Sequence, residues 1–234
     1  MMKTLIMIPA FGCDGRLYEA VSEVLGDIIR IQIITPTADR YAVMVEEVLA
    51  QAPNTFAILG TSMGGRVALE VALAAPNRVR GLVVIGAGAG PTVDPAAGLR
   101  RSARIRNGEM SVVLQEMGDM VSHLAGPLGA NARDALIKMG GDMGRAALAR
   151  QSDALARRID LWDSLPKIAC PTLCLWGVHD KFSPPEDGKR IAASVQNGRY
   201  MELNNCGHFP TLEYPDETAL ILKNWSVEQV ISNW

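Results

Sequence analysis

The stretch from Thr55 to Ala68, TFAILGTSMGGRVA, decides the fold expected for this chain. Its first half is typical of a buried strand, and its second half carries small residues at helical spacing. The turn between them reads Gly60-x-Ser62-x-Gly64. A sharp turn from strand to helix holds a serine hydroxyl clear of the backbone when its neighbours are small. The stretch therefore predicts a strand, a nucleophilic serine and a helix, in that order.

The pentapeptide alone has a second interpretation, because a serine before a helix is often only its N-cap. The order of the later residues distinguishes the two interpretations. A hydrolytic serine on such a turn is followed along the chain by an acid and then a histidine, each at the end of a later strand.

Strand-like and helix-like segments alternate on both sides of the serine, which is typical of a parallel sheet covered by helices on both faces. We therefore predict an α/β fold, a mainly parallel doubly wound sheet of about six strands. From 91 to 160 the alternation stops, and helical patterns occur without a convincing strand. This predicts one core at 1–90 and 161–234 with a helical cap at 91–160. The expected strands are 3–8, 28–34, 55–59, 78–85, 171–176 and 199–203.

Size and charge restrict the class of partner. A chain of 234 residues with 48% hydrophobic content can bury one large core. A net charge of -2 and a pI near 5.9 give no basic surface for nucleic acid or an anionic membrane, so we expect a small-molecule substrate. The N-terminal apolar run is too short for a signal peptide, and no segment reaches about 18 uninterrupted apolar residues. We therefore expect a cytoplasmic protein without a membrane segment.

Four cysteines are spread along the chain without the spacing of a disulfide framework or a metal site. Cys170 and Cys174 are four apart, which on a strand separates them by about 13 Å. We predict that all four are buried and reduced, with no metal and no cofactor. They are Cys13, Cys170, Cys174 and Cys206.

An acid and a histidine follow two of the later expected strands. Asp180 comes after the strand that ends at Trp176, and His208 lies in the loop after 199–203. Because the carboxyl ends of parallel strands meet at one edge of the sheet, both side chains are expected near Ser62. His208 is suited to take the Ser62 proton, and Asp180 to fix the tautomer of the ring.

Other titratable residues compete for these roles. Asp94 also follows a strand, after the flexible Gly86-Ala-Gly-Ala-Gly90 loop, but we favour Asp180. His179 is expected to point away from Asp180, and His123 is expected on a cap helix. In the cap, one apolar stripe is expected to pack or to line an adaptable pocket, and an arginine cluster either forms a solvated face or holds a substrate carboxylate. The stripe is Val113, Met117, Met120, Val121 and Leu124, and the arginines are Arg100, Arg101, Arg104 and Arg106.

These motifs together resemble those of the α/β-hydrolase superfamily, over nearly the whole chain. Gly60-Thr-Ser-Met-Gly-Gly65 resembles the nucleophile elbow, 171–184 the acid loop and 206–210 the histidine loop. The resemblance implies that Ser62 is the nucleophile, Asp180 the acid and His208 the base. It also implies an oxyanion hole from the backbone N–H groups of Met63 and Phe11.

The sequence departs from the family pattern in three places. Pro9-Ala10 replaces the usual His-Gly pair of the oxyanion loop, the segment common after the second strand is missing, and the antiparallel strands that often begin the fold are expected to be absent. The core is thus a trimmed version of the fold.

The resemblance implies a cofactor-independent serine hydrolase of the carboxylesterase kind, acting on a small, fairly apolar ester or related acyl substrate. Two alternatives remain open: a carbon–carbon hydrolase or lyase similar to the menaquinone-pathway synthase, and a slow-turnover ligand-binding receptor on the same fold. The expected substrate contacts are Met117, Met120, His123 and Phe209.

Overall fold

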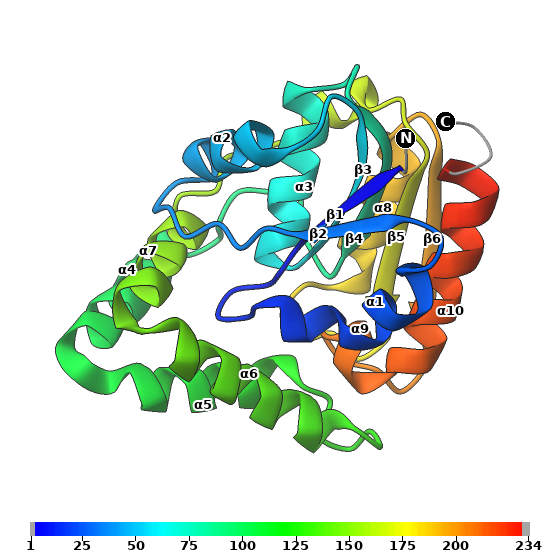
Figure 1. The fold of residues 1–234 in the computed structure, drawn as a ribbon. Helices are drawn as coiled ribbons and strands as arrows, with labels where there is room; N and C mark the ends of the chain where they lie inside the picture. Colours follow the sequence, from blue (N-terminus) through cyan, green and yellow to red (C-terminus); the bar gives the residue numbers. More distant parts are fainter. Residues whose placement is uncertain (1–2, 231–234) are drawn as a thin grey trace.

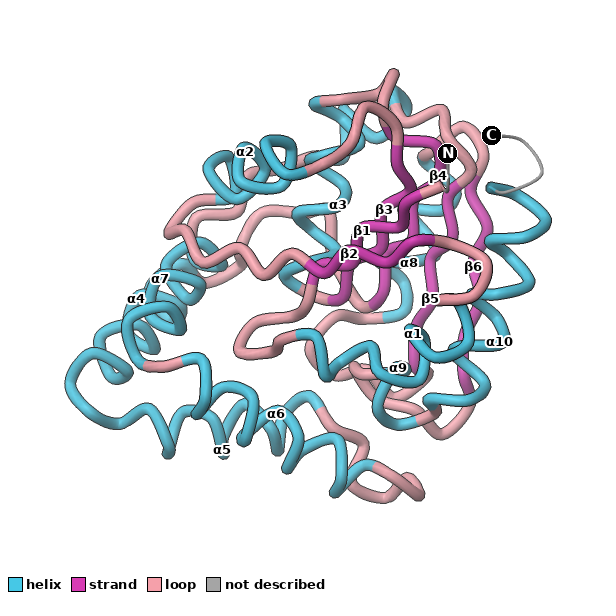
Figure 2. Tube along the Cα trace, in the orientation of Figure 1, coloured by secondary structure: helices cyan, strands magenta, loops and turns pink. Residues whose placement is uncertain are grey.

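A computed structural model describes residues 3–230. Within them, six strands form one parallel sheet in the order β2-β1-β3-β4-β5-β6 (Figures 1 and 2). The predicted α/β class and parallel sheet are confirmed, and no antiparallel strand occurs in this part of the chain. The strands are β1 (Thr4–Ile8), β2 (Arg30–Ile33), β3 (Phe56–Thr61), β4 (Val79–Ile85), β5 (Thr172–Gly177) and β6 (Gly198–Leu203).

Burial follows position in the sheet. Strands β1, β3 and β5 are buried along their whole length, whereas the edge strands β2 and β6 are largely exposed. Strand β2 is shorter than the predicted 28–34. Ile28 and Ile29 precede it, because their N–H groups bond to the Leu25 carbonyl oxygen in a turn.

Helices cover both faces of the sheet (Figure 1). From β1 the chain moves outward to β2 and then returns to β3 and β4, so right-handed crossovers place the helix of the outward step on one face and the helices of the return steps on the other. Helices α1 and α10 pack together on one face, while α2 and α3 pack together on the other, where α8 contacts β5 and β6. The helices are α1 (Glu19–Leu25), α2 (Tyr41–Gln51), α3 (Met63–Ala74), α8 (Pro185–Ser194) and α10 (Pro215–Trp225).

Four more helices lie between β4 and β5 and form a separate group in Figure 1, where α4 pairs with α7 and α5 with α6. A π-helical segment, Ile105–Glu109, joins α4 to α5. The division of the chain into a core and a cap with the stated boundaries stays a prediction. The helices are α4 (Pro95–Arg104), α5 (Met110–Val121), α6 (Gly129–Met143) and α7 (Arg145–Ala156).

The predicted apolar stripe of this region is wrong in two members. Val113, Met117 and Val121 are buried at four-residue spacing, but Met120 is 49% exposed because it lies on the other side of α5. Leu124 is also half exposed, because α5 ends at Val121 and the helical period no longer applies beyond it.

Two further expectations concern membranes and thiols. None of the helices within 3–230 combines the length and apolar character needed to cross a bilayer. The four cysteines are free of disulfides, and three are buried. Cys170 differs from the prediction: it is only partly buried, because it lies in the bend that precedes β5.

Candidate active site

Ser62 lies at the turn between β3 and α3 in a strained backbone conformation, with φ 56° and ψ -115°. Such values are rare for a residue with a side chain. The glycines around it are required by space. A Cβ on Gly60 would lie 2.0 Å from the Gly64 carbonyl oxygen, and one on Gly64 would lie 1.9 Å from that of Ile8. Small residues therefore let α3 begin against the end of β1 and hold the serine in this turn.

Asp180 and His208 form a buried pair. Asp180 Oδ2 lies 2.7 Å from His208 Nδ1, and the aromatic rings of Phe182 and Phe209 contact the imidazole at centroid distances of 5.2 and 5.1 Å. The other carboxylate oxygen of Asp180 accepts hydrogen bonds from the N–H groups of Phe182 and Ser183. Both the acid and the ring are thus held in one orientation.

The two loops meet because β5 and β6 are neighbours whose pairing continues past the strand ends. The N–H of Val178 donates to the Leu203 carbonyl oxygen at 3.0 Å, and that of His179 donates to Cys206 at 2.8 Å. Adjacent loops then place Asp180 and His208 side by side.

Gly86 leaves space for this pair, and no site role was predicted for it. Strand β4 lies between β3 and β5, so its following loop must turn away from the site. Gly86 does so with φ +57°, and a Cβ there would lie 3.0 Å from His208 Nδ1. The alternating glycines of Gly86-Ala-Gly-Ala-Gly90 are the sequence feature that could have indicated this turn.

Glu213 is a second residue that the sequence analysis missed. Its buried carboxylate accepts hydrogen bonds from the N–H groups of Gly207, Phe209 and His123. The N–H of His208 itself donates to the Val121 carbonyl oxygen at 2.9 Å. The histidine loop is therefore fixed to the end of α5 as well as to the start of α9 (Pro210–Glu213).

The two residues expected to form an oxyanion hole lie on either side of the serine. Met63 is the first residue of α3, so its N–H has no acceptor within the helix. Phe11 lies in the loop after β1. Gln151 of α7 holds that loop, since its Oε1 accepts from the Gly12 N–H at 3.0 Å while its Nε2 donates to the Pro36 carbonyl oxygen at 3.0 Å.

Ser62 and His208 line one small cavity of about 10 Å³, which is close to the volume needed by a single water molecule. Within the described residues, His208 Nε2 is buried without a hydrogen-bond partner. The other side chains that line this cavity are all apolar. They are Ala10, Phe11, Met117, Val121, Leu136, Leu155, Phe182 and Phe209.

Of the four residues expected to contact substrate, two line the cavity and two do not. Met117 and Phe209 line the cavity with Ser62, whereas the exposed Met120 does not. His123 lies past the end of α5 rather than on a helix, because the chain leaves the helical conformation at Ser122. Its ring stacks on His179 at 4.2 Å, and its Nε2 lies 2.9 Å from Asn205 Oδ1, so it faces away from the cavity.

The competing acid lies elsewhere. Asp94 is exposed and caps α4, where it accepts a hydrogen bond from the Ala97 N–H and pairs with Arg100. The predicted arginine cluster is also divided. Arg104 pairs with two glutamates at the surface, while Arg101 lies over the Phe11 ring at 5.2 Å.

This arrangement of sheet, turn and loops defines the class of α/β hydrolases. The profile of the Alpha/beta hydrolase family matches residues 9–219, and the chain belongs to that family. The predicted superfamily is thereby confirmed.

Among curated proteins, the chain is similar to hydrolases. It is 32% identical to 2-hydroxy-6-oxononadienedioate/2-hydroxy-6-oxononatrienedioate hydrolase 2 of Pseudomonas putida over 176 residues, covering 68% of this chain and 58% of that protein. The match thus spans little more than half of the P. putida protein. Pimeloyl-[acyl-carrier protein] methyl ester esterase of Aliivibrio salmonicida is 25% identical, with coverages of 91% and 88%.

Solved structures share the fold. A thermophilic esterase from Thermogutta terrifontis superposes with a TM-score of 0.88 at 22% identity, covering 97% of this chain and 90% of that one. MenH from S. aureus gives a TM-score of 0.83 at 18% identity, with coverages of 97% and 94%. At these identities the likeness is one of fold alone.

Proposed function

We propose that this protein is a cofactor-independent serine hydrolase that cleaves an ester or related acyl bond of a small, fairly apolar substrate. The observation that carries the proposal is the Asp180–His208 pair, whose unpaired Nε2 lines the same cavity as Ser62. Membership of a family whose similar relatives are hydrolases supports it.

The proposed reaction begins with a proton transfer. His208 Nε2 accepts the Ser62 hydroxyl proton while Oγ attacks the acyl carbon, and Asp180 stabilises the imidazolium that forms. The N–H groups of Met63 and Phe11 then stabilise the negative oxygen of the tetrahedral intermediate. His208 returns the proton to the leaving group, which departs and leaves an acyl group on Ser62. Water, activated by the same histidine, releases the acid.

Carbon–carbon bond hydrolysis is the second candidate, because the relative in P. putida is named as a hydrolase of 2-hydroxy-6-oxononadienedioate. That compound has no ester or amide bond, so its hydrolysis must break a carbon–carbon bond. The same serine, histidine and acid would serve it. A comparison of methyl ester hydrolysis with cleavage of 2-hydroxy-6-oxononadienedioate distinguishes the two candidates.

Active-site labelling tests the proposal against a receptor without turnover. We expect a fluorophosphonate probe to modify Ser62, located by mass spectrometry of the labelled peptide, and p-nitrophenyl esters to be hydrolysed through many turnovers. Ser62→Ala is the control and should lose both. A label on another serine, or a single turnover per molecule, would reject the proposed function.

A further inference from the structure

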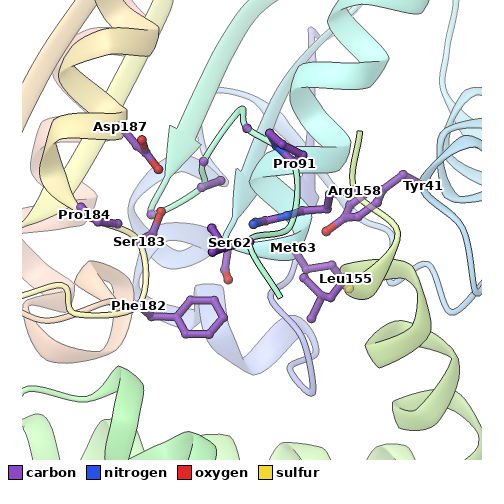
Figure 3. Close-up of a pocket in the computed structure, with 15 residues that line it drawn as sticks. Tyr41, Ser62, Met63, Pro91, Leu155, Arg158, Phe182, Ser183, Pro184 and Asp187 are labelled. Atoms are coloured by element: carbon purple, nitrogen blue, oxygen red, sulfur yellow. The ribbon is translucent and has the colours of Figure 1, made fainter. Parts of the chain in front are cut away.

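A second and larger pocket opens beside Ser62, with a volume of about 460 Å³ (Figure 3). Its walls come from five parts of the chain: the start of α2, the turn at Ser62, the loop after β4, the segment around the end of α7, and the loop from Asp180 into α8. Because Ser62 and Met63 form part of its lining, a group bound here would belong to the molecule attacked at Ser62.

Two polar groups of this pocket have unpaired atoms. Arg158 Nε and the Tyr41 hydroxyl are both buried without a hydrogen-bond partner among the described residues. Figure 3 shows the Arg158 side chain extending into the pocket toward the side where Ser62 lies. Burial lowers the pKa of Arg158 and raises that of Tyr41. Unpaired buried donors of this kind are costly unless a ligand satisfies them.

The neighbouring Arg66 shows what a structural arginine does in this place. Its guanidinium donates to the carbonyl oxygens of Ala89, Gly90 and Ile159 and pairs with Glu70 at 2.7 Å. It thereby fastens two segments of the pocket wall. Among the described residues, Arg158 makes no such hydrogen bonds, so its guanidinium is available to a ligand.

We propose that Arg158 and the Tyr41 hydroxyl bind a carboxylate of the substrate, so that the preferred substrates are half-esters of short dicarboxylic acids. This inference rests on the proposed function, because it assumes that the ester end reaches Ser62. Guanidinium groups match carboxylates in geometry and charge, and the phenol adds a hydrogen bond.

Asp187 restricts the charge of that ligand. Its carboxylate lies on the opposite side of the pocket in Figure 3, and burial raises its pKa. Because burial already disfavours the charged form of Asp187, a second negative charge on the ligand would add to that cost, so a doubly charged phosphate is disfavoured relative to a single carboxylate.

The test compares acid and neutral esters of equal length. We expect the wild-type protein to hydrolyse monomethyl adipate with a higher kcat/KM than methyl hexanoate, measured by methanol release, with monomethyl succinate and glutarate reporting the preferred spacing. Arg158→Gln should reduce kcat/KM for the best acid ester by about 10- to 100-fold more than for its neutral partner, since hydrogen bonds to charged groups are worth that much. Tyr41→Phe should reduce the same ratio, but by less.

Arg157→Gln is the matched control, because Arg157 is the adjacent residue and is exposed. It should leave the ratio of the two esters unchanged, and thermal melting should show that every variant is folded. Equal losses on acid and neutral esters in Arg158→Gln would overturn the carboxylate site while leaving the proposed hydrolase intact.

Calorimetry measures carboxylate binding independently of ester hydrolysis. We expect Ser62→Ala to bind monomethyl adipate, which it should not hydrolyse, and the double variant with Arg158→Gln to bind it about 10-fold or more weakly. Equal binding by both variants would reject the site. Binding that depends on Arg158, in a wild-type protein that neither labels at Ser62 nor hydrolyses any ester, would keep the carboxylate site and reject the proposed reaction.

Discussion

Ser62 is both the proposed nucleophile and a residue with a strained backbone. Its φ of 56° and ψ of -115° cost about 1–3 kcal/mol in a residue with a Cβ, which the surrounding packing must offset. The turn that exposes the hydroxyl is therefore less stable than a glycine turn of the same shape.

The first prediction separates the two properties of Ser62. Ser62→Ala and Ser62→Gly should both lose ester hydrolysis by about a thousandfold or more, because neither retains the attacking oxygen. Ser62→Gly should unfold at a higher urea concentration than Ser62→Ala, because glycine adopts this conformation with less strain. Urea denaturation of both variants measures the difference, and a glycine variant no more stable than the alanine variant would contradict the strain argument.

The second prediction concerns the acid. Asp180→Asn should reduce kcat by about a thousandfold or more, because an amide no longer fixes the tautomer of His208 or stabilises its cation. Asp94→Asn is the matched control, since its side chain caps α4 and lies away from His208. It should retain most of the activity. Initial rates with one p-nitrophenyl ester compare the variants, and the reverse order of activity would transfer the role to Asp94.

Single site residues could be predicted from the sequence where the local structure accepts only one type of residue at a position. The glycines around Ser62 and the loop positions of Asp180 and His208 follow from the pattern of strand, turn and helix. The roles of Glu213 and Gln151 did not, because Glu213 accepts from His123 and Gln151 donates to Pro36, each about a hundred residues away, and a lone Glu or Gln in a sequence carries no record of such partners.

At the scale of elements, the histidine loop depends on Glu213. Its carboxylate accepts three N–H groups, of which Gly207 and Phe209 flank His208 directly. An acceptor-only side chain is needed here, because every group that faces it is a donor.

The third prediction follows from that requirement. Glu213→Gln turns one acceptor into a donor, so it should destabilise the fold by about 1–3 kcal/mol and lower kcat with little change in KM. Glu217→Gln, on the exposed first turn of α10, is the control and should change neither quantity. Loss of stability with an unaltered kcat would show that Glu213 supports the fold without positioning His208.

Most elements could be predicted because their apolar residues have a clear period. The segment after β1 is an exception: its apolar residues have helical spacing from Leu17 to Leu25, but the chain first forms a tight turn, Gly15–Tyr18, which Asp14 caps, and α1 begins only at Glu19. The apolar stripe of α5 failed in a similar way, because the helix ends at Val121, and no proline marks that end in the sequence.

At the scale of the whole molecule, the helices between β4 and β5 bring Met117, Val121, Leu136 and Leu155 to the cavity that holds Ser62. We expect this layer to determine the choice of substrate while the sheet loops determine the chemistry.

The fourth prediction tests this division. Met117→Ala should shift the preference across a series of p-nitrophenyl esters toward longer acyl groups, because it enlarges the cavity, while a small activated acetate is still hydrolysed. Met120→Ala is the control, since that side chain is exposed and lies off the cavity. An unchanged series in Met117→Ala, or an equal shift in both variants, would show that the acyl group binds elsewhere.

The sheet order and the loops that meet at its carboxyl edge could be foreseen, because strand periodicity and right-handed crossovers leave few arrangements. The lining of the pockets could not. Arg158 and Tyr41 are more than a hundred residues apart in the sequence, and only the return of the chain after α7 brings them to one pocket.

The hydrogen bond from the His208 N–H to the Val121 carbonyl oxygen also limits how such a protein can diverge. The end of α5 and the loop of the proposed base share one hydrogen-bonded network, so neither segment can be exchanged without regard to the other. A chimaera that inherits its helical layer from another parent would need a backbone that places the carbonyl of residue 121 against the His208 N–H and the N–H of residue 123 against Glu213. The end of α5 and the histidine loop are therefore expected to be inherited together, even where the rest of the helical layer is replaced.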